Sequence, residues 1–297
     1  MLLVVSYASF VFFATKFGVP GPGSVAFASS PGKASAMWWH FLGRLVHGNF
    51  SDLGLDESYT WRAFGHTGAL LGLTAVLVIV FALAVGILAA TRAGTMLDLL
   101  LRTLSYVAWG IPAFVLAIVL WWTTRVQGWP GECGIFGFFG QLTCVTTRVT
   151  AWSAFEQLML PSVALAVSFI GLHARYLRSS LLVSLHAPYT TTARAKGVRE
   201  RTVIFRHALR NSLATFISAL LLDFGAIFGA ALAVDYIFRL DGVGTLFLYE
   251  ISASSETAGV HFYSVSLLLT LTAALVLLAS FTAEGAVAWL DPRARWR

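Results

Sequence analysis

The sequence has few charged residues for its length. Of its 297 residues, 20 are Lys or Arg and 14 are Asp or Glu. Only 11% are therefore charged, whereas soluble domains carry about 25%. By contrast, 58% are hydrophobic, and the mean hydropathy is +0.78. So few charges cannot cover a water-soluble globule of this size, and 14% aromatic residues exclude a disordered chain. The composition predicts a polytopic membrane protein.

Residue patterns that carry enzymatic chemistry are also missing. The seven histidines are scattered without ligand spacing, so no metal site is expected. Gly32 and Lys33 lack the earlier glycine of a phosphate-binding loop, because Phe27 stands in its place. The sequence contains no Gly-x-Ser-x-Gly elbow and no paired intramembrane aspartates. We therefore expect no catalytic residues, no cofactor bound by this chain, no nucleic-acid partner and no enzymatic activity.

Long apolar runs, in contrast, are plentiful. A transmembrane helix needs about 20 mostly apolar residues. An opening helix over residues 1–15 lacks a basic start and a clean cleavage site, which favours a membrane helix over a signal peptide. Residues 16–68 then form an extracytoplasmic segment, and residues 69–297 form the main transmembrane domain. The other predicted spans are Ala69–Ala90, Leu104–Thr124, Leu158–Leu172, Leu213–Tyr236 and Ser264–Ala283.

The predicted fold class is thus an all-α membrane protein with about six transmembrane helices. Pro112, inside the run 104–124, is expected to kink its helix rather than to mark a binding site.

The distribution of basic residues predicts the orientation. If both termini are cytoplasmic, 13 of the 20 basic residues lie in inside segments, as the positive-inside rule requires. The loop from Arg125 to Gln157 then lies outside, where Cys133 and Cys144 can form a disulfide. The alternative is a pair of unrelated thiols.

The most polar stretch of the chain runs from Ala174 to Leu213. Thr190 to Lys196 favours a short helix, Gly197 interrupts it, and Val198 to Arg210 resumes helical spacing. This element is too charged to enter lipid, so it either lies on anionic headgroups or docks into another protein. Along 198–210 the apolar residues Val203, Ile204 and Ala208 share a side of the helix, while Arg199, Arg206 and Arg210 lie elsewhere.

The order of residues in this stretch is more specific than a run of charges. Residues 189–197, YTTTARAKG, and 207–213, HALRNSL, resemble the cytoplasmic signature of ABC-importer permeases. Within that group they resemble the B-type subunits of the dipeptide, oligopeptide and nickel permease family. Residues 175–182, 237–244 (IFRLDGVG) and 290–295 (LDPRAR) resemble further motifs of this family, so the resemblance covers most of the chain.

The match to the general importer signature is not complete. Ala193 and Gly197 fit it, but Thr191 stands at a Glu position, Thr192 at an Ala position and Arg210 at a Pro position. Peptide-type members commonly depart in this way.

The resemblance implies the type I fold of ABC-importer permeases and a location in the bacterial inner membrane. It implies a second homologous permease subunit as a heterodimer partner, an extracytoplasmic solute-binding protein, and cytoplasmic ATPase subunits that use ATP and magnesium. The polar element would form coupling helices in a groove of the ATPase, with Ala193 as a small residue on the docking face. The implied coupling residues are Tyr189, Thr191, Thr192, Ala193, Arg194, Ala195, Lys196, Gly197, Phe205, Arg206, His207 and Leu209.

One acidic residue lies inside a predicted span. Asp223 shares a helical stripe with Ala219, Ala226 and Ala230. An ionisable group at this depth marks a translocation path or makes a structural hydrogen bond to a neighbouring helix. On another side, Gly225 and Gly229 form a Gly-x-x-x-Gly pair that permits close helix packing.

These observations favour the permease subunit of an ATP-driven importer for peptides or a related small solute. The alternative is an ATP-independent secondary transporter or channel, which would show inverted repeats with interrupted helices. The sequence shows no matching halves.

Overall fold

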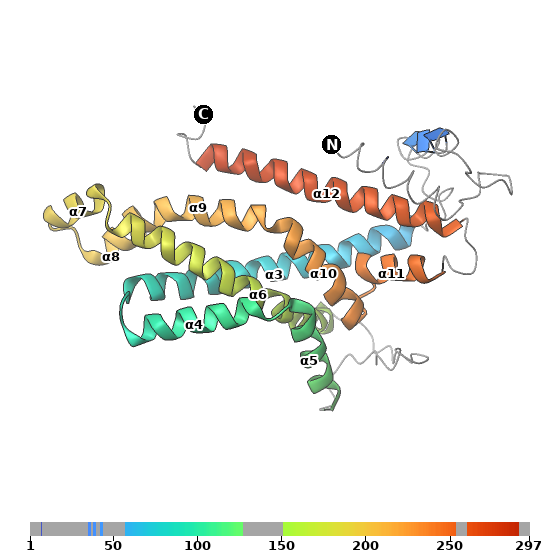
Figure 1. Cartoon of the computed structure of the whole chain (residues 1–297), viewed down its shortest axis with the longest axis horizontal. Helices are drawn as coiled ribbons and strands as arrows, with labels where there is room; N and C mark the ends of the chain where they lie inside the picture. The colour runs from blue at the N-terminus through green and yellow to red at the C-terminus, as the bar shows by residue number, and fades with distance from the viewer. Residues whose placement is uncertain are drawn as a thin grey trace. The chain divides into compact units, whose positions relative to one another are not determined.

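The computed structural model describes residues 57–126, 151–253 and 260–290, together with Tyr7, 35–36, 38–39 and 42–43. Within these ranges every regular element is helical (Figure 1). In chain order they are α3 (Glu57–Thr91), α4 (Met96–Gly110), α5 (Ala113–Val126), α6 (Ala151–Leu185), α7 (Pro188–Ala195), α8 (Glu200–Thr202), the π-helix η2 (Val203–Ala208), α9 (Leu209–Leu222), α10 (Phe224–Phe238), α11 (Val243–Ala253) and α12 (Val260–Leu290).

Two stretches of the described chain, Ser58–Thr91 and Gln157–Leu185, are each long and apolar enough to cross a membrane. Two bent helix pairs raise that number to four if each pair is one span. The predicted spans 69–90 and 158–172 lie inside the two straight stretches, and the protein is an all-α membrane protein. Both helices extend well beyond the predicted spans, because hydropathy marks only the apolar part of a helix. Of the predicted opening helix, only Tyr7 is described.

The predicted kink at Pro112 is confirmed, and it is sharp. Helices α4 and α5 meet at 89°, so the run 104–124 is a broken span or a re-entrant loop. Ile111 is extended (φ −88°, ψ 116°), as expected for a residue that precedes proline. Its freed carbonyl accepts a hydrogen bond from the Ser168 hydroxyl of α6 at 2.7 Å. The bend is therefore supported from the neighbouring helix.

The predicted span 213–236 is also divided. Asp223 ends α9, and α10 leaves it at an angle of 48°. The predicted stripe through Ala219, Asp223, Ala226 and Ala230 therefore does not run along one continuous helix.

The chain forms two compact units. Unit 1 comprises residues 1–68 and 239–278, and unit 2 comprises residues 69–238 and 279–297. In unit 1 the Thr67 hydroxyl accepts a hydrogen bond from the backbone N–H of Val243 at 2.9 Å, and His66 Nδ1 donates to the Leu240 carbonyl at 2.8 Å. These bonds attach the first turns of α3 to the residues before and at the start of α11.

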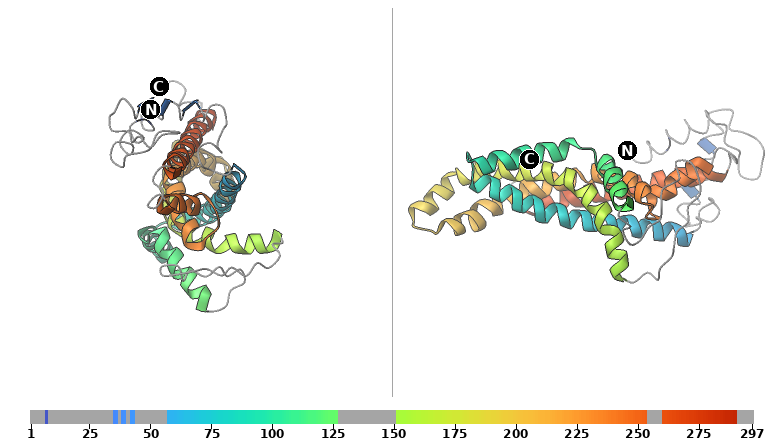
Figure 2. Two further views of the ribbon diagram at one scale, coloured as in Figure 1. Left: turned by 90° about the vertical axis from the view of Figure 1, so that its right-hand side faces the viewer. Right: turned by 90° about the horizontal axis from the view of Figure 1, so that it is seen from below.

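Unit 2 is built around α6, which packs against α4, α5 and α9. One core cluster contains Leu177 and Phe216, and a second contains Leu181 and Ala208. At Gly86 the backbones of α3 and α6 approach closely, since an added Cβ would lie 3.0 Å from the carbonyl oxygen of Ala174. Elements α7 and α8 project from one end of this bundle, away from α5 (Figures 1 and 2).

Candidate functional site

The projecting element begins with a tight junction between α6 and α7. The Thr190 hydroxyl is fully buried, 2.7 Å from the carbonyl of Ala187 and 3.1 Å from those of Ser184 and Leu185. The last carbonyls of a helix have no partner within the helix, so a side chain that reaches them stabilises its end. Thr190, which the resemblance did not single out, thus anchors α7 on α6.

The chain then reverses at Gly197, as the sequence predicted. Its φ is +77°, a left-handed conformation that costs other residues about 1–2 kcal/mol. Its N–H donates to the Arg194 carbonyl at 2.9 Å, and an added Cβ would meet nothing within 4 Å. Glycine is needed here because of the left-handed backbone conformation. A larger side chain would have enough space.

Hydrogen bonds from the Arg194 side chain stabilise this bend. Arg194 donates from Nε and Nη2 to the two carboxylate oxygens of Glu200, at 3.0 and 2.8 Å, and from Nη1 to the Leu185 carbonyl at 3.0 Å. The Arg194 guanidinium holds the pKa of Glu200 below its usual range, chiefly through the side-chain hydrogen bond. The Arg194 side chain therefore connects α6, α7 and α8 through hydrogen bonds. The sequence, in which Arg194 is one residue of a basic stretch, did not predict this structural role.

Beyond the bend, the second predicted helix is not a separate element. Helix α8 passes into η2, which continues into α9, and the Leu209 N–H donates to the Ile204 carbonyl five residues before it. Such widened turns are rare and often occur at functional sites. The predicted apolar side is confirmed: Val203 and Ala208 are fully buried and Ile204 packs on the second core cluster.

The predicted coupling residues divide into two groups. Ala193 is buried, and Leu209 is half-buried and packs against both core clusters. The small size of Ala193 is explained by packing within this chain. His207 is half-buried. The other predicted residues are exposed, including two large apolar side chains, Tyr189 at 44% and Phe205 at 57%. The exposed set is Tyr189, Thr191, Thr192, Arg194, Ala195, Lys196, Gly197, Phe205 and Arg206, which we call the coupling surface.

A buried ion pair joins α4 to α6 near the same end. Arg178 donates to both carboxylate oxygens of Asp98, at 2.7 and 2.8 Å, and Asp98 is 1% exposed. Asp98 also accepts from the Gly94 N–H at 3.0 Å, and its own N–H donates to the N-cap hydroxyl of Thr95 at 3.4 Å. Sequence reasoning missed this pair. The spacing Thr-x-x-Asp is a helix-start signal, but nothing in it points to Arg178.

Asp223 contacts a histidine of α6. Its Oδ2 lies 3.4 Å from Nε2 of His173, which is fully buried. His173 Nδ1 lies 2.8 Å from the Phe169 carbonyl and therefore carries a hydrogen. Within the described chain neither His173 Nε2 nor Asp223 Oδ2 makes a hydrogen bond, and the Asp223 side chain is 29% exposed, so both roles of Asp223 stay predictions.

The other predicted sites receive less support from the described chain. No described atom lies within 4 Å of a Cβ built on Gly229, so Gly229 makes no close contact with the described chain, and the close helix packing at Gly225 and Gly229 stays a prediction. Cys133 and Cys144 lie outside the described residues, and their disulfide stays a prediction. Among the described residues, no group of three or more His, Cys, Asp or Glu could hold a metal ion.

Solved structures of ABC transporters share this fold. A chain of the MetNI methionine ABC transporter matches with a TM-score of 0.57 and 20% identity, over 80% of this chain and 100% of that chain. The helical bundle thus has the fold of that ABC transporter chain.

Sequence comparison identifies the family. The family model for the binding-protein-dependent transport system inner membrane component matches residues 82–296, so the chain belongs to this family and is a permease subunit of an ABC importer. The oligopeptide transport system permease protein AppB of Bacillus subtilis is 28% identical over 85% of this chain and 78% of its own length. A probable peptide ABC transporter permease protein, y4tP of Sinorhizobium fredii, is 29% identical over 75% of this chain and 67% of its own length.

Membership in this family implies separate ATPase and substrate-binding subunits as partners.

Proposed function

We propose that this chain is one of two homologous permease subunits that form the translocation path of a peptide importer. The names of its relatives support peptides as the cargo, since both AppB and y4tP are described as peptide-type permeases. The second permease would pack on faces that this chain leaves open, such as the helix surface around Gly229. Asp223 would lie beside the path, 3.4 Å from His173.

The coupling surface would receive the ATPase, and this is the observation that carries the proposal. Tyr189 and Phe205 expose large apolar side chains on an element that is otherwise polar and projects from the bundle. Exposed aromatic residues surrounded by charge are typical anchors of protein interfaces. ATP and magnesium would bind the ATPase alone, and this chain would transmit the movement.

Transport with reconstituted subunits tests this function. Proteoliposomes that contain this chain, its partner permease, the ATPase subunits and the binding protein should take up a labelled oligopeptide only when ATP is supplied. We expect Tyr189→Ala with Phe205→Ala to lower uptake at least tenfold, because two interface anchors together contribute several kcal/mol.

The control is Met96→Ala, which removes an 81% exposed apolar side chain from the start of α4. It should leave uptake unchanged. Uptake without ATPase subunits would support the alternative of a self-contained transporter, and equal losses in the two variants would argue against a docking role for the coupling surface.

We further propose that both termini and the coupling surface are cytoplasmic, in the bacterial inner membrane. The excess of basic residues on that side supports it. A cysteine placed by Arg295→Cys should resist a membrane-impermeant maleimide in intact cells and react after permeabilisation. Rapid labelling in intact cells would contradict this orientation.

A further inference from the structure

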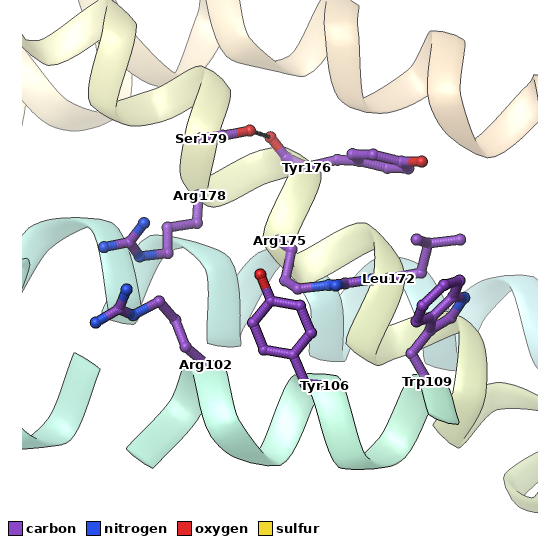
Figure 3. Close-up of a pocket in the computed structure, with 8 residues that line it drawn as sticks. All are labelled: Arg102, Tyr106, Trp109, Leu172, Arg175, Tyr176, Arg178 and Ser179. Carbon is purple, nitrogen blue, oxygen red and sulfur yellow. Dashed lines mark hydrogen bonds between the residues drawn. The ribbon is translucent and has the colours of Figure 1, made fainter. Parts of the chain in front are cut away.

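A basic and aromatic pocket lies between α4 and α6 in unit 2. Its volume is about 480 Å³. Figure 3 shows Arg102, Tyr106 and Trp109 rising from α4 toward α6, and Arg175 and Arg178 pointing from α6 toward α4. The coupling surface does not include these residues, and none of them belongs to the Asp223 contact.

The pocket has an excess of positive charge. Asp98 neutralises Arg178 through the paired hydrogen bonds, and it lies 3.6 Å from Nε of Arg102. Arg102 Nε is buried without a hydrogen-bond partner. Three guanidinium groups thus face one carboxylate, which leaves about two positive charges for a ligand.

Arg175 is held with its donors available. Its guanidinium carbon lies 4.4 Å from the ring centre of Tyr106 and 4.9 Å from that of Trp109, and its Nε donates to the Gly171 carbonyl at 3.3 Å. Stacking between two rings fixes the plane of a guanidinium. Within the described chain, neither Nη atom of Arg175 donates a hydrogen bond, so both can reach an anion.

The depth of the pocket matches the headgroup region. Helix α6 has 35 residues and is about 52 Å long, whereas the hydrocarbon layer is about 30 Å thick. Its ends must therefore lie in headgroups or water. Arg178 and Arg175 lie about 10 and 15 Å before the end of α6 at Leu185. That places the guanidinium groups near the boundary of the leaflet closest to α7.

The surroundings favour a lipid over a soluble anion. On the side of the pocket away from α7, α4 exposes Trp109, and Leu172 of α6 lines the pocket. In a bilayer these side chains would contact acyl chains, and Tyr106 and Trp109 are residue types that occur at the headgroup level. A phosphate held at the guanidinium groups would have its glycerol and acyl chains along this apolar surface.

We infer that this pocket binds the phosphate of an anionic phospholipid, with Arg175 and Arg102 as its donors. Basic pockets between helices are known to bind such headgroups. This inference does not depend on the identity of the transported solute. An occupied pocket would add charge-assisted hydrogen bonds to the α4–α6 contact.

Lipid titration of the purified importer tests the site. Native mass spectrometry of the detergent-solubilised complex would compare phosphatidylglycerol with phosphatidylcholine. We expect one strongly retained phosphatidylglycerol per copy of this chain. Arg175→Gln should weaken its binding about tenfold and leave phosphatidylcholine unchanged, because a charge-assisted hydrogen bond is lost. Arg175→Lys keeps the charge and loses the planar stacking. Its binding of phosphatidylglycerol should be weaker than that of the unchanged protein and stronger than that of Arg175→Gln.

The matched control is Arg92→Gln, which removes an exposed positive charge just after α3 and outside the pocket. It should bind phosphatidylglycerol like the unchanged protein. Equal weakening by Arg92→Gln, or equal retention of the two lipids, would overturn the inference. Displacement of the lipid by millimolar inorganic phosphate would also overturn it, since the occupant would then be a soluble anion.

Discussion

Gly197→Pro is expected to abolish ATP-driven transport by the assembled importer while this chain still inserts in the membrane. Proline fixes φ near −65°, whereas Gly197 has φ +77°, and proline removes the N–H that bonds the Arg194 carbonyl at 2.9 Å. The chain would then lose its bend at Gly197, and the two hydrogen bonds between Arg194 and Glu200 would be lost as well. We expect ATPase-coupled uptake in proteoliposomes to fall at least tenfold and co-purification of the ATPase to weaken.

Gly94→Pro is the matched control for this loss. Gly94 also has positive φ, +81°, also has open space beside it, and also donates one hydrogen bond, to Asp98 at 3.0 Å. Because that bond supports a buried ion pair, this variant should cost at least as much stability as Gly197→Pro. Gly94→Pro should nevertheless retain more ATP-driven uptake and more bound ATPase than Gly197→Pro. Full ATPase recruitment and normal uptake with Gly197→Pro would refute the coupling role of the bend.

The contacts of α7 explain why a docked ATPase could move the bundle. Thr190 and Arg194 fasten α7 to the end of α6, and Val203 and Ala208 are buried on the way into α9. A displacement applied at Tyr189 would therefore pass to two long helices as a rigid-body movement. Ala193→Glu, by contrast, would disrupt this element from within, because Ala193 is buried.

Local features of the fold could be predicted from the sequence. Apolar runs marked two membrane-spanning helices, Pro112 marked a kink, Gly197 marked a bend, and helical spacing put Val203 and Ala208 on one buried side. Each of these depends on a residue's own backbone preference or on neighbours within one or two turns.

Contacts across long sequence distances could not be predicted in the same way. Asp98 and Arg178 are 80 residues apart, and neither their spacing nor their composition links them. The break at Asp223 is similar, since no proline or glycine precedes it in α9 and its contact partner, His173, lies on α6. For Arg194 the sequence indicates only a charge on a docking surface, because the folded bend alone brings Glu200 and the Leu185 carbonyl to it.

Asp98→Ala is expected to cause the largest loss of stability, about 3–5 kcal/mol, because it leaves the charge of Arg178 buried and unpaired beside Arg102. Thermal unfolding of the purified chain should shift down by roughly 5–15 °C. The double variant Asp98→Ala with Arg178→Ala should lose less than the sum of the two single variants, since neither buried charge then remains.

The pair Arg194–Glu200 provides the comparison that assigns this loss to burial. Both pairs have two hydrogen bonds between a guanidinium and a carboxylate, at 2.7 and 2.8 Å in one and at 3.0 and 2.8 Å in the other. They differ in side-chain exposure, 19% and 1% for Arg178 and Asp98 against 39% and 56% for Arg194 and Glu200. Because solvent screens exposed pairs, Glu200→Ala should cost at most about 1 kcal/mol. Equal shifts for Asp98→Ala and Glu200→Ala would show that the buried pair does not hold α4 on α6.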